Sequence, residues 1–210
     1  MEKRKPGRPS KNDSRRVEIL EKAASCFTLY GYNKTTLDDI GDALGFNKAA
    51  LYYYFKNKEE LFSHVMSHEL ERLFEILKAE TEALNGFENK MTKYFDVRPD
   101  VYLGLFKLNG LSKDNIINLN ESLNILYVPF KEKEIDFLIK ISKSENFSFK
   151  ETELRRLFNL IIETQSAITM SSILLNNIEQ DKAKLEGLKQ MKSTVLKHFL
   201  HSLKTNFNPQ

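Results

Sequence analysis

Residues 35–61 constrain the fold more than any other part of the chain. Their apolar residues follow helical spacing and are interrupted by Gly45, whose lack of a Cβ suits the left-handed end of a helix. Thr36 can cap the helix before this turn, with Asp39 placed to complete a capping box. Asn47 can cap the helix after it. Two short helices joined by a glycine turn form a helix-turn-helix, which lays its second helix in the DNA major groove.

Helical spacing of apolar residues continues over the rest of the chain, and no segment alternates as a β-strand would. We expect further helices at about residues 14–30, 57–84, 150–175 and 181–203. In the region before residue 150, Pro99 and Pro129 should break or kink the helices, because proline lacks a backbone N–H. The sequence therefore predicts an all-α protein.

The pattern divides the chain into three regions. They are a disordered basic arm at residues 1–13, a three-helix helix-turn-helix domain at 14–60 and a helical body at 61–210. Disorder is expected in the arm because it is polar and carries two prolines. Residues 1–16 contain seven Lys or Arg against two Asp or Glu, whereas the whole chain carries a net charge of only +3. This distribution indicates a polyanionic partner at the N-terminal end.

The arm contains a short tract, from Arg4 to Pro9, that resembles an AT-hook. In such a tract Gly7 lets the backbone approach DNA closely, and Arg8 enters the narrow minor groove of A·T-rich DNA. The alternative is a solvated basic tail that attracts DNA of any sequence. The sequence leaves both interpretations open.

Residues 14–62 resemble the DNA-binding domain of the TetR family of bacterial transcriptional regulators. The resemblance rests on an ungapped set of residues at matching spacing: Phe27, Gly31, Tyr32, Thr35, Thr36, Ile40, Gly45, Leu51, Tyr52, Phe55, Lys58, Glu59, Glu60 and Leu61. It implies that the helical body is a C-terminal ligand-binding and dimerisation domain. It also implies a homodimer formed through the last two helices, reading a near-palindromic operator in double-stranded DNA. The expected function is repression that is released when a small molecule binds the body.

Candidate DNA contacts lie mainly on the second helix of the motif. By spacing, the residues that face the major groove are Lys48, Ala49, Ala50 and Tyr53. Lysine can donate to guanine, and alanine methyls can contact thymine methyls. Thr36 and Asn47 stand at helix N-termini, which suit phosphate. The resemblance implies phosphate contacts from Tyr52, Tyr54 and Lys58. The alternative is that the tyrosine run packs the domain, and we expect Leu51 and Phe55 to do so.

The candidate ligand site combines aromatic and polar residues of the body. Its members are Phe95, Tyr102, Phe106, Tyr127, Phe130 and Phe158, with Gln165 and Thr169 as polar groups. An apolar pocket with a few polar groups is the usual form of a small-molecule site. We expect a lipophilic ligand, whose identity the sequence does not give. The alternative for each aromatic residue is ordinary core packing.

Two histidine pairs offer a competing interpretation as a metal-binding protein or an enzyme. His64 and His68 are four residues apart, a spacing that zinc sites use on one helix face, and His198 and His201 are three apart. The first pair lacks the glutamate of an HExxH motif, and no phosphate loop or nucleophile elbow is present. We therefore expect an exposed histidine pair, no enzymatic activity, no metal and no cofactor.

The expected location is the cytoplasm. The chain has a single cysteine, Cys26, which suits a reducing compartment and is expected to pack as a small apolar residue. No apolar run approaches the ~20 residues that a membrane span needs.

Overall fold

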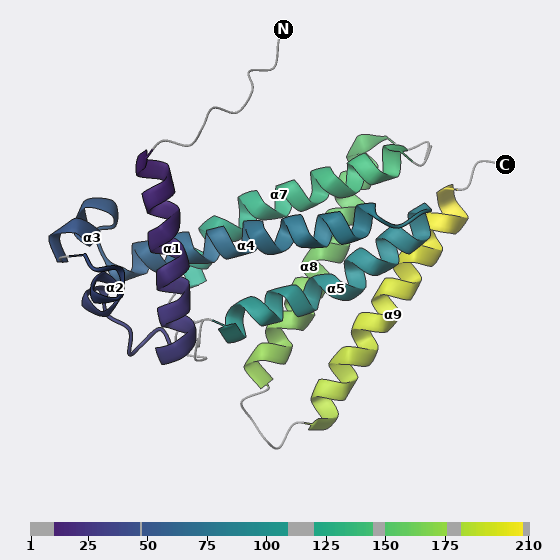
Figure 1. Ribbon diagram of the computed structural model, residues 1–210. Helices are drawn as coiled ribbons and strands as arrows, with labels where there is room; N and C mark the ends of the chain where they lie inside the picture. The colour runs from purple at the N-terminus through teal and green to yellow at the C-terminus, as the bar shows by residue number, and fades with distance from the viewer. Residues whose placement is uncertain (1–10, 47, 109–119, 145–149, 176–181, 208–210) are drawn as a thin grey trace, which may run out of the picture. The chain divides into compact units, whose positions relative to one another are not determined.

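The computed structural model describes residues 11–46, 48–108, 120–144, 150–175 and 182–207 (Figure 1). All regular structure in these ranges is helical, which confirms the predicted all-α fold. The helices are α1 (Lys11–Tyr30), α2 (Leu37–Leu44), α3 (Lys48–Tyr54), α4 (Lys58–Glu82), α5 (Phe87–Leu108), α7 (Asn120–Ser144), α8 (Glu151–Leu175) and α9 (Lys182–Phe207). None of these helices is long and apolar enough to cross a membrane.

Three expectations about helix limits are corrected. The first helix begins at Lys11, so the last three residues of the predicted arm are helical. Helix α5 continues through Pro99, and α7 continues through Pro129. In α7, buried Phe130 follows the proline directly, and buried Glu134 comes four residues after Phe130. Tertiary packing supplies most of the stability of a protein helix, and it outweighs the one hydrogen bond that proline removes.

The chain divides into two compact units, one of residues 1–69 and 107–111 and the other of residues 70–106 and 112–210. The first boundary therefore falls inside α4, later than the residue 60 expected from the sequence. The first unit has a core in which α1, α2, α3 and the start of α4 meet. Its fully buried members include Ile19, Ala23, Phe27, Ile40, Leu51, Phe55, Leu61, Phe62 and Val65.

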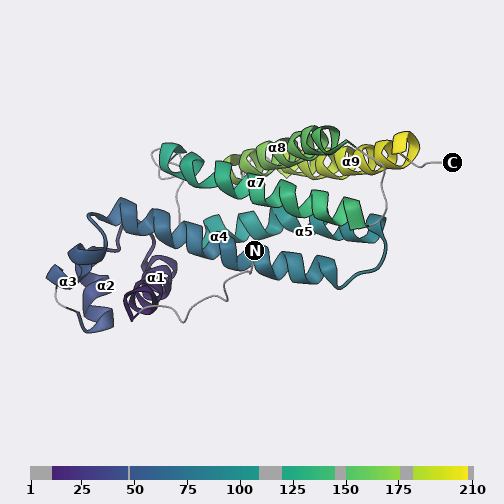
Figure 2. The ribbon, with the colours of Figure 1, turned by 90° about the horizontal axis from the view of Figure 1, so that it is seen from above.

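The second unit is a bundle of the remainder of α4 with α5, α7, α8 and α9. Helix α8 packs against both α7 and α9, and Figure 2 shows α8 and α9 side by side. Edge-to-face contacts of Phe74 with Phe130 and Phe137 join α4 to α7. Phe95 of α5 lies against Phe158 of α8 and Phe199 of α9. The Tyr94 ring of α5 lies 5.8 Å from the Phe137 ring of α7, so aromatic packing links all five helices of this unit.

Candidate functional site

The turn between α2 and α3 has the geometry that the sequence predicts. Thr36 is the N-cap of α2: its hydroxyl accepts from the backbone N–H of Asp39 at 3.1 Å, and its own backbone N–H donates to the Asp39 carboxylate at 2.8 Å. The Thr36 hydroxyl also donates to that carboxylate, and this bond holds the pKa of Asp39 below its usual value. Gly45 ends α2 in the left-handed region with φ of 68°. The Thr36 side chain is therefore committed to capping α2.

Helix α3 presents one face to the core and another to solvent. Leu51 and Phe55 are buried, as expected. Tyr53 is 77% exposed, Tyr52 is also exposed, and Tyr54 is half-buried with its ring 5.1 Å from that of Tyr53. Of the two alanines, Ala49 is exposed and Ala50 is half-buried. Tyr52 and Tyr53 therefore do not pack in the core of the domain.

Three of the predicted DNA contacts cannot be placed by their side chains. Lys48 begins α3, but its side chain lies outside the described part of the structure, as do Asn47 and Arg8.

Helix α2 packs closely against α3 at Gly41. A Cβ there would lie 3.3 Å from Leu51 Cδ1 and 3.4 Å from the Phe46 carbonyl oxygen. The turn thus brings α3 into a tight contact that only glycine accommodates without displacement.

Lys58 is held by the first unit itself. Its Nζ donates to the Tyr32 carbonyl oxygen at 3.1 Å and lies 4.5 Å from the centre of the Tyr32 ring. The Tyr32 hydroxyl donates to Glu59 at 3.4 Å, and burial together with this carboxylate raises the pKa of Tyr32 to about 12. Lys58 remains half-exposed. It therefore ties the start of α4 to the segment after α1.

The prediction that His64 and His68 are exposed is wrong. Both side chains are half-buried. His64 Nε2 lies 2.9 Å from an Arg16 guanidinium nitrogen, so the ring nitrogen accepts a hydrogen bond from this arginine. Among the described residues, no group of three or more His, Cys, Asp or Glu side chains could hold a metal ion. A ring nitrogen that accepts from a guanidinium is not available as a zinc ligand.

Acid should destabilise the first unit through His64. Burial and the nearby Arg16 charge lower the pKa of His64 from 6.5. As the pH falls, His64 therefore becomes protonated in the unfolded chain before it does so in the folded protein. The contribution of neutral His64 to folding stability is complete above about pH 6.5 and is lost as the pH falls through the folded pKa. Urea unfolding between about pH 7.5 and about pH 5.5 measures the loss. His64→Gln should reduce it, whereas the exposed His198→Gln in the other unit should not; an unchanged pH dependence in His64→Gln contradicts the assignment.

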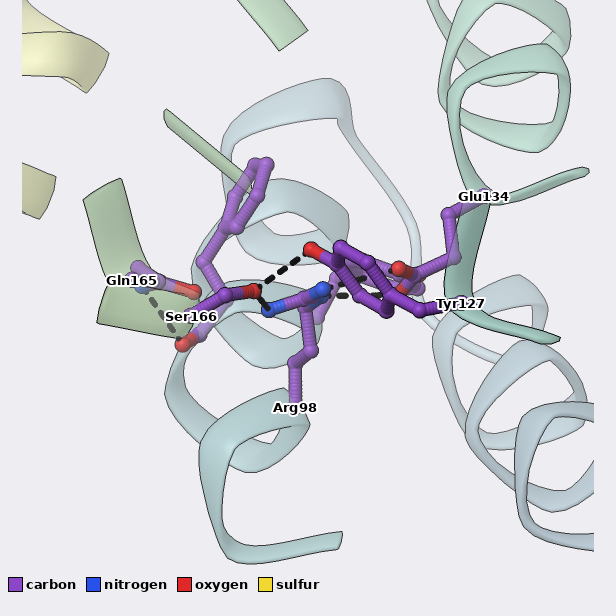
Figure 3. Close-up of polar contacts among 7 residues, drawn as sticks. Arg98, Tyr127, Glu134, Gln165 and Ser166 are labelled. Carbon is purple, nitrogen blue, oxygen red and sulfur yellow. Dashed lines mark hydrogen bonds and ion pairs between the residues drawn. The ribbon is translucent and has the colours of Figure 1, made fainter. Parts of the chain in front are cut away.

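A buried polar network lies in the second unit (Figure 3). Arg98 of α5 and Glu134 of α7 are each 1% exposed and form a two-point ion pair, with N–O distances of 2.7 and 2.8 Å. The Tyr94 hydroxyl donates to the same carboxylate at 2.6 Å. Ser166 of α8 accepts from Arg98 at 3.2 Å and lies 2.7 Å from the Tyr127 hydroxyl. The network therefore connects three helices and extends from the core to the partly exposed Tyr127.

Gln165 lies next to this network and is fully buried. Its side-chain N–H donates to the Phe95 carbonyl oxygen at 3.0 Å, which fixes the orientation of the amide. Its Oε1 then has no hydrogen-bond partner, alone among the buried side-chain oxygen and nitrogen atoms of the described residues. A buried acceptor without a partner costs about 1–3 kcal/mol. The Gln165 side-chain oxygen thus lacks a hydrogen-bond donor in the interior of the second unit.

The predicted ligand residues are distributed between core and network. Phe95, Phe130 and Phe158 are buried in aromatic contacts, and Thr169 of α8 is also buried. Tyr127 is part of the network. Tyr102 and Phe106 belong to α5, but their side chains lie outside the described residues. The structure therefore brings Phe95 and Gln165 into direct contact and gives the other buried aromatics a packing role.

Arg98 and Glu134 are not among the residues predicted from the sequence. The signal was present, because each charged residue occupies a position that helical spacing assigns to the core. Arg98 follows buried Tyr94 by four residues, and Glu134 lies four residues from both Phe130 and Leu138. A pair of opposite charges at core positions of two helices predicts a buried ion pair.

A capped short helix, a left-handed glycine turn and a second short helix with an exposed face define the first unit as a helix-turn-helix domain. Residues 19–65 match the model of a family described as bacterial regulatory proteins, tetR family. Residues 19–65 thus resemble the helix-turn-helix domain of this family and lie at the N-terminal end of the chain.

Similar proteins extend the match. The HTH-type transcriptional repressor KstR2 of Mycolicibacterium smegmatis is 41% identical over 69 residues, which cover 33% of this chain and 34% of that protein. The biofilm operon regulator IcaR of Staphylococcus epidermidis is 26% identical over 159 residues, covering 70% and 80%. A crystal structure of a transcriptional regulator from Cytophaga hutchinsonii shares the fold with a TM-score of 0.64 at 24% identity, covering 90% and 98%. The match to KstR2 thus spans only about a third of the length of that protein.

Proposed function

We propose that the protein is a DNA-binding transcriptional repressor that acts as a homodimer and is released from its operator by a small molecule. The observation that carries this proposal is the exposed face of α3, with Tyr53 at its centre, on a helix held by the capped α2 and its glycine turn. Side chains on the second helix of such a motif read base edges. The names of the matched relatives, which are repressors or negative regulators, support repression.

The DNA contacts proposed for this face are those expected from the sequence. Ala49, Ala50 and Tyr53 stand on the solvent side or edge of α3, and Tyr52 beside them is exposed. Lys48 belongs to the same helix. Lys58 and Thr36 are engaged within the domain, so we assign them to holding α4 and α2 in place rather than to a primary phosphate contact.

A dimer through α8 and α9 is supported by apolar side chains that these helices expose. Leu160 of α8 is 65% exposed and Met191 of α9 is 52% exposed. Covering such residues in a subunit interface is favourable because it removes apolar surface from water. A two-fold dimer would place two recognition helices about one DNA turn apart, roughly 34–36 Å, and would read a near-palindromic operator.

The effector is proposed to bind in the helical body beside Phe95 and Gln165. Support comes from the buried Gln165 Oε1, which lacks a donor and which a ligand N–H or O–H could satisfy. The aromatic surroundings favour a lipophilic molecule. Because α4 runs unbroken from the first unit into the second, we propose that effector binding changes the tilt of α4 and so lowers operator affinity.

Selection of bound genomic fragments tests the function. Purified full-length protein is mixed with fragments of the source genome at a stated, near-physiological salt concentration, because phosphate contacts make affinity depend steeply on salt. A recurrent palindrome with half-sites about one turn apart is the expected result. Salt-sensitive binding with no recurrent sequence would leave a non-specific DNA binder, and no binding at all would refute the proposal.

Removal of residues 1–9 should weaken binding mainly to operators with A·T-rich flanks. The AT-hook-like tract around Arg8 is proposed to enter the narrow minor groove there, where the negative potential is enhanced. Titrations of the parent and the shortened chain with A·T-flanked and G·C-flanked operators measure the effect. An equal loss on both DNAs would reduce the arm to a charged tail that attracts any duplex.

A further inference from the structure

Two consecutive arginines of α1 lie against the two phenylalanines that bracket α3. The Arg15 guanidinium is 4.3 Å from the centre of the Phe46 ring, and the Arg16 guanidinium is 4.8 Å from the centre of the Phe55 ring. Phe46 precedes α3 by two residues, and Phe55 follows its last residue directly. A guanidinium within about 6 Å of an aromatic ring centre is attracted to the ring face. Both ends of α3 are thus attached to α1 by the same kind of contact.

Each guanidinium is held by a second partner, which fixes its direction. Arg15 forms an ion pair with Glu18 of the same helix at 2.8 Å. Arg16 donates to His64 Nε2 at 2.9 Å, and the His64 ring itself lies 5.5 Å from the Phe55 ring. The Arg16 side chain is half-buried, and Phe55 is in the core. Arg16 therefore joins α1, the end of α3 and α4 at one point.

The length of α3 makes these end contacts important. The helix has seven residues, and a helix this short has few internal hydrogen bonds to hold it. Its orientation must then come from tertiary contacts. Recognition of base edges requires side chains to be held within about 0.5 Å and 10–20° of the binding geometry. A small rotation of α3 would move exposed Tyr53 relative to the bases and leave the overall charge of the domain unchanged.

We propose that Arg15 and Arg16 are positioning residues that set the orientation of α3, and hence the sequence discrimination of the protein, through Phe46 and Phe55. The inference rests on the proposed function, because it assumes that α3 reads DNA. It assigns these two basic side chains of α1 a role other than attraction of phosphate. The two roles differ in a measurable way, since a phosphate contact contributes to the salt dependence of binding and an internal contact does not.

Affinities of full-length variants for the selected operator and for an unrelated duplex of equal length, each at several salt concentrations, separate the two roles. Arg15→Met and Arg16→Met keep an unbranched apolar side chain and remove the guanidinium charge. We expect operator affinity to fall about tenfold in each, with the affinity for the unrelated duplex and the operator salt slope unchanged. Loss on both duplexes with a salt slope reduced by about 1 would show a phosphate contact and overturn the proposal.

Phe46→Leu provides an independent test, because it removes the ring and leaves Arg15 in place. It should reproduce the loss of operator affinity seen in Arg15→Met, and the double variant should lose little more than either single one. If Phe46→Leu binds the operator as tightly as the parent does, the contact between Arg15 and Phe46 does not set the orientation of α3. Arg15→Lys keeps a cation over the ring and should restore much of the discrimination. Arg156→Met removes an exposed arginine from the other unit and should change neither affinity nor salt slope.

Folding and the proposed function are checked in the same experiment. Circular dichroism melting of each variant identifies a loss that comes from unfolding, and if Arg16→Met fails to fold, Arg15→Met and Phe46→Leu decide the outcome. A parent protein with no operator preference would refute the proposed function. A parent that discriminates, together with folded variants that discriminate equally well, would refute the positioning role alone.

Discussion

Replacing Glu134 with Gln is expected to lower the free energy of unfolding of the helical body by about 3–5 kcal/mol. The change removes the negative charge that faces the Arg98 guanidinium at 2.7 and 2.8 Å, and both side chains are 1% exposed. Arg98 would then lose the carboxylate that balances its buried charge, and burying a charge that is less well compensated is costly. Urea denaturation followed by circular dichroism measures the effect.

The same helix supplies a matched control for this experiment. Glu132, two residues earlier in α7, forms an ion pair with Arg155 at 2.8 Å, but both partners are exposed. Glu132→Gln should therefore change stability by less than about 1 kcal/mol. Replacing both members of the buried pair with apolar residues, as in Arg98→Met with Glu134→Leu, should recover much of the loss, because no unpaired charge remains. A Glu134→Gln protein as stable as Glu132→Gln would contradict the importance of the pair.

Tyr53→Ala should reduce operator affinity by about 1–3 kcal/mol while leaving folding and dimerisation intact. Tyr53 is 77% exposed, so its removal leaves no cavity in the core, and its loss acts through the proposed contact with DNA. Fluorescence anisotropy with the selected operator measures the change. Because the contact is directed at bases, the affinity for an unrelated duplex should change less than the affinity for the operator.

Tyr30→Ala is the matched control for Tyr53→Ala. Tyr30 is the last residue of α1 and is 58% exposed in the same unit. Its replacement removes an equally large aromatic side chain and should not alter operator binding. If Tyr53→Ala binds operator as tightly as the parent and Tyr30→Ala, the assignment of the α3 face to the major groove is wrong.

The sequence specified the helix-turn-helix because its signals are local. Thr36 and Asp39 lie three residues apart in one capping box, and Gly45 needs only its own backbone angles to end α2. Such features depend on residues close in sequence, so spacing alone predicts them. The exposed and buried faces of α3 follow from helical periodicity in the same way.

The contacts that the sequence did not reveal join residues far apart in the chain. Arg98 and Glu134 are separated by 36 positions, and Arg16 and His64 by 48. Whether two such side chains meet depends on how the helices pack, which no local pattern determines. The break predicted at Pro99 was wrong for the same reason, because α5 continues through it, and α7 likewise does not restart at Pro129.

The buried pair of Arg98 and Glu134 has a consequence for how this protein can change during evolution. A substitution that neutralises only one member of the pair leaves the other charge buried without its opposite charge, which is strongly destabilising. Loss of both together is tolerated far better. The two positions are therefore expected to vary in concert among related chains, as an Arg–Glu pair or as two uncharged residues. Natural variation at these positions would then record the contact between α5 and α7.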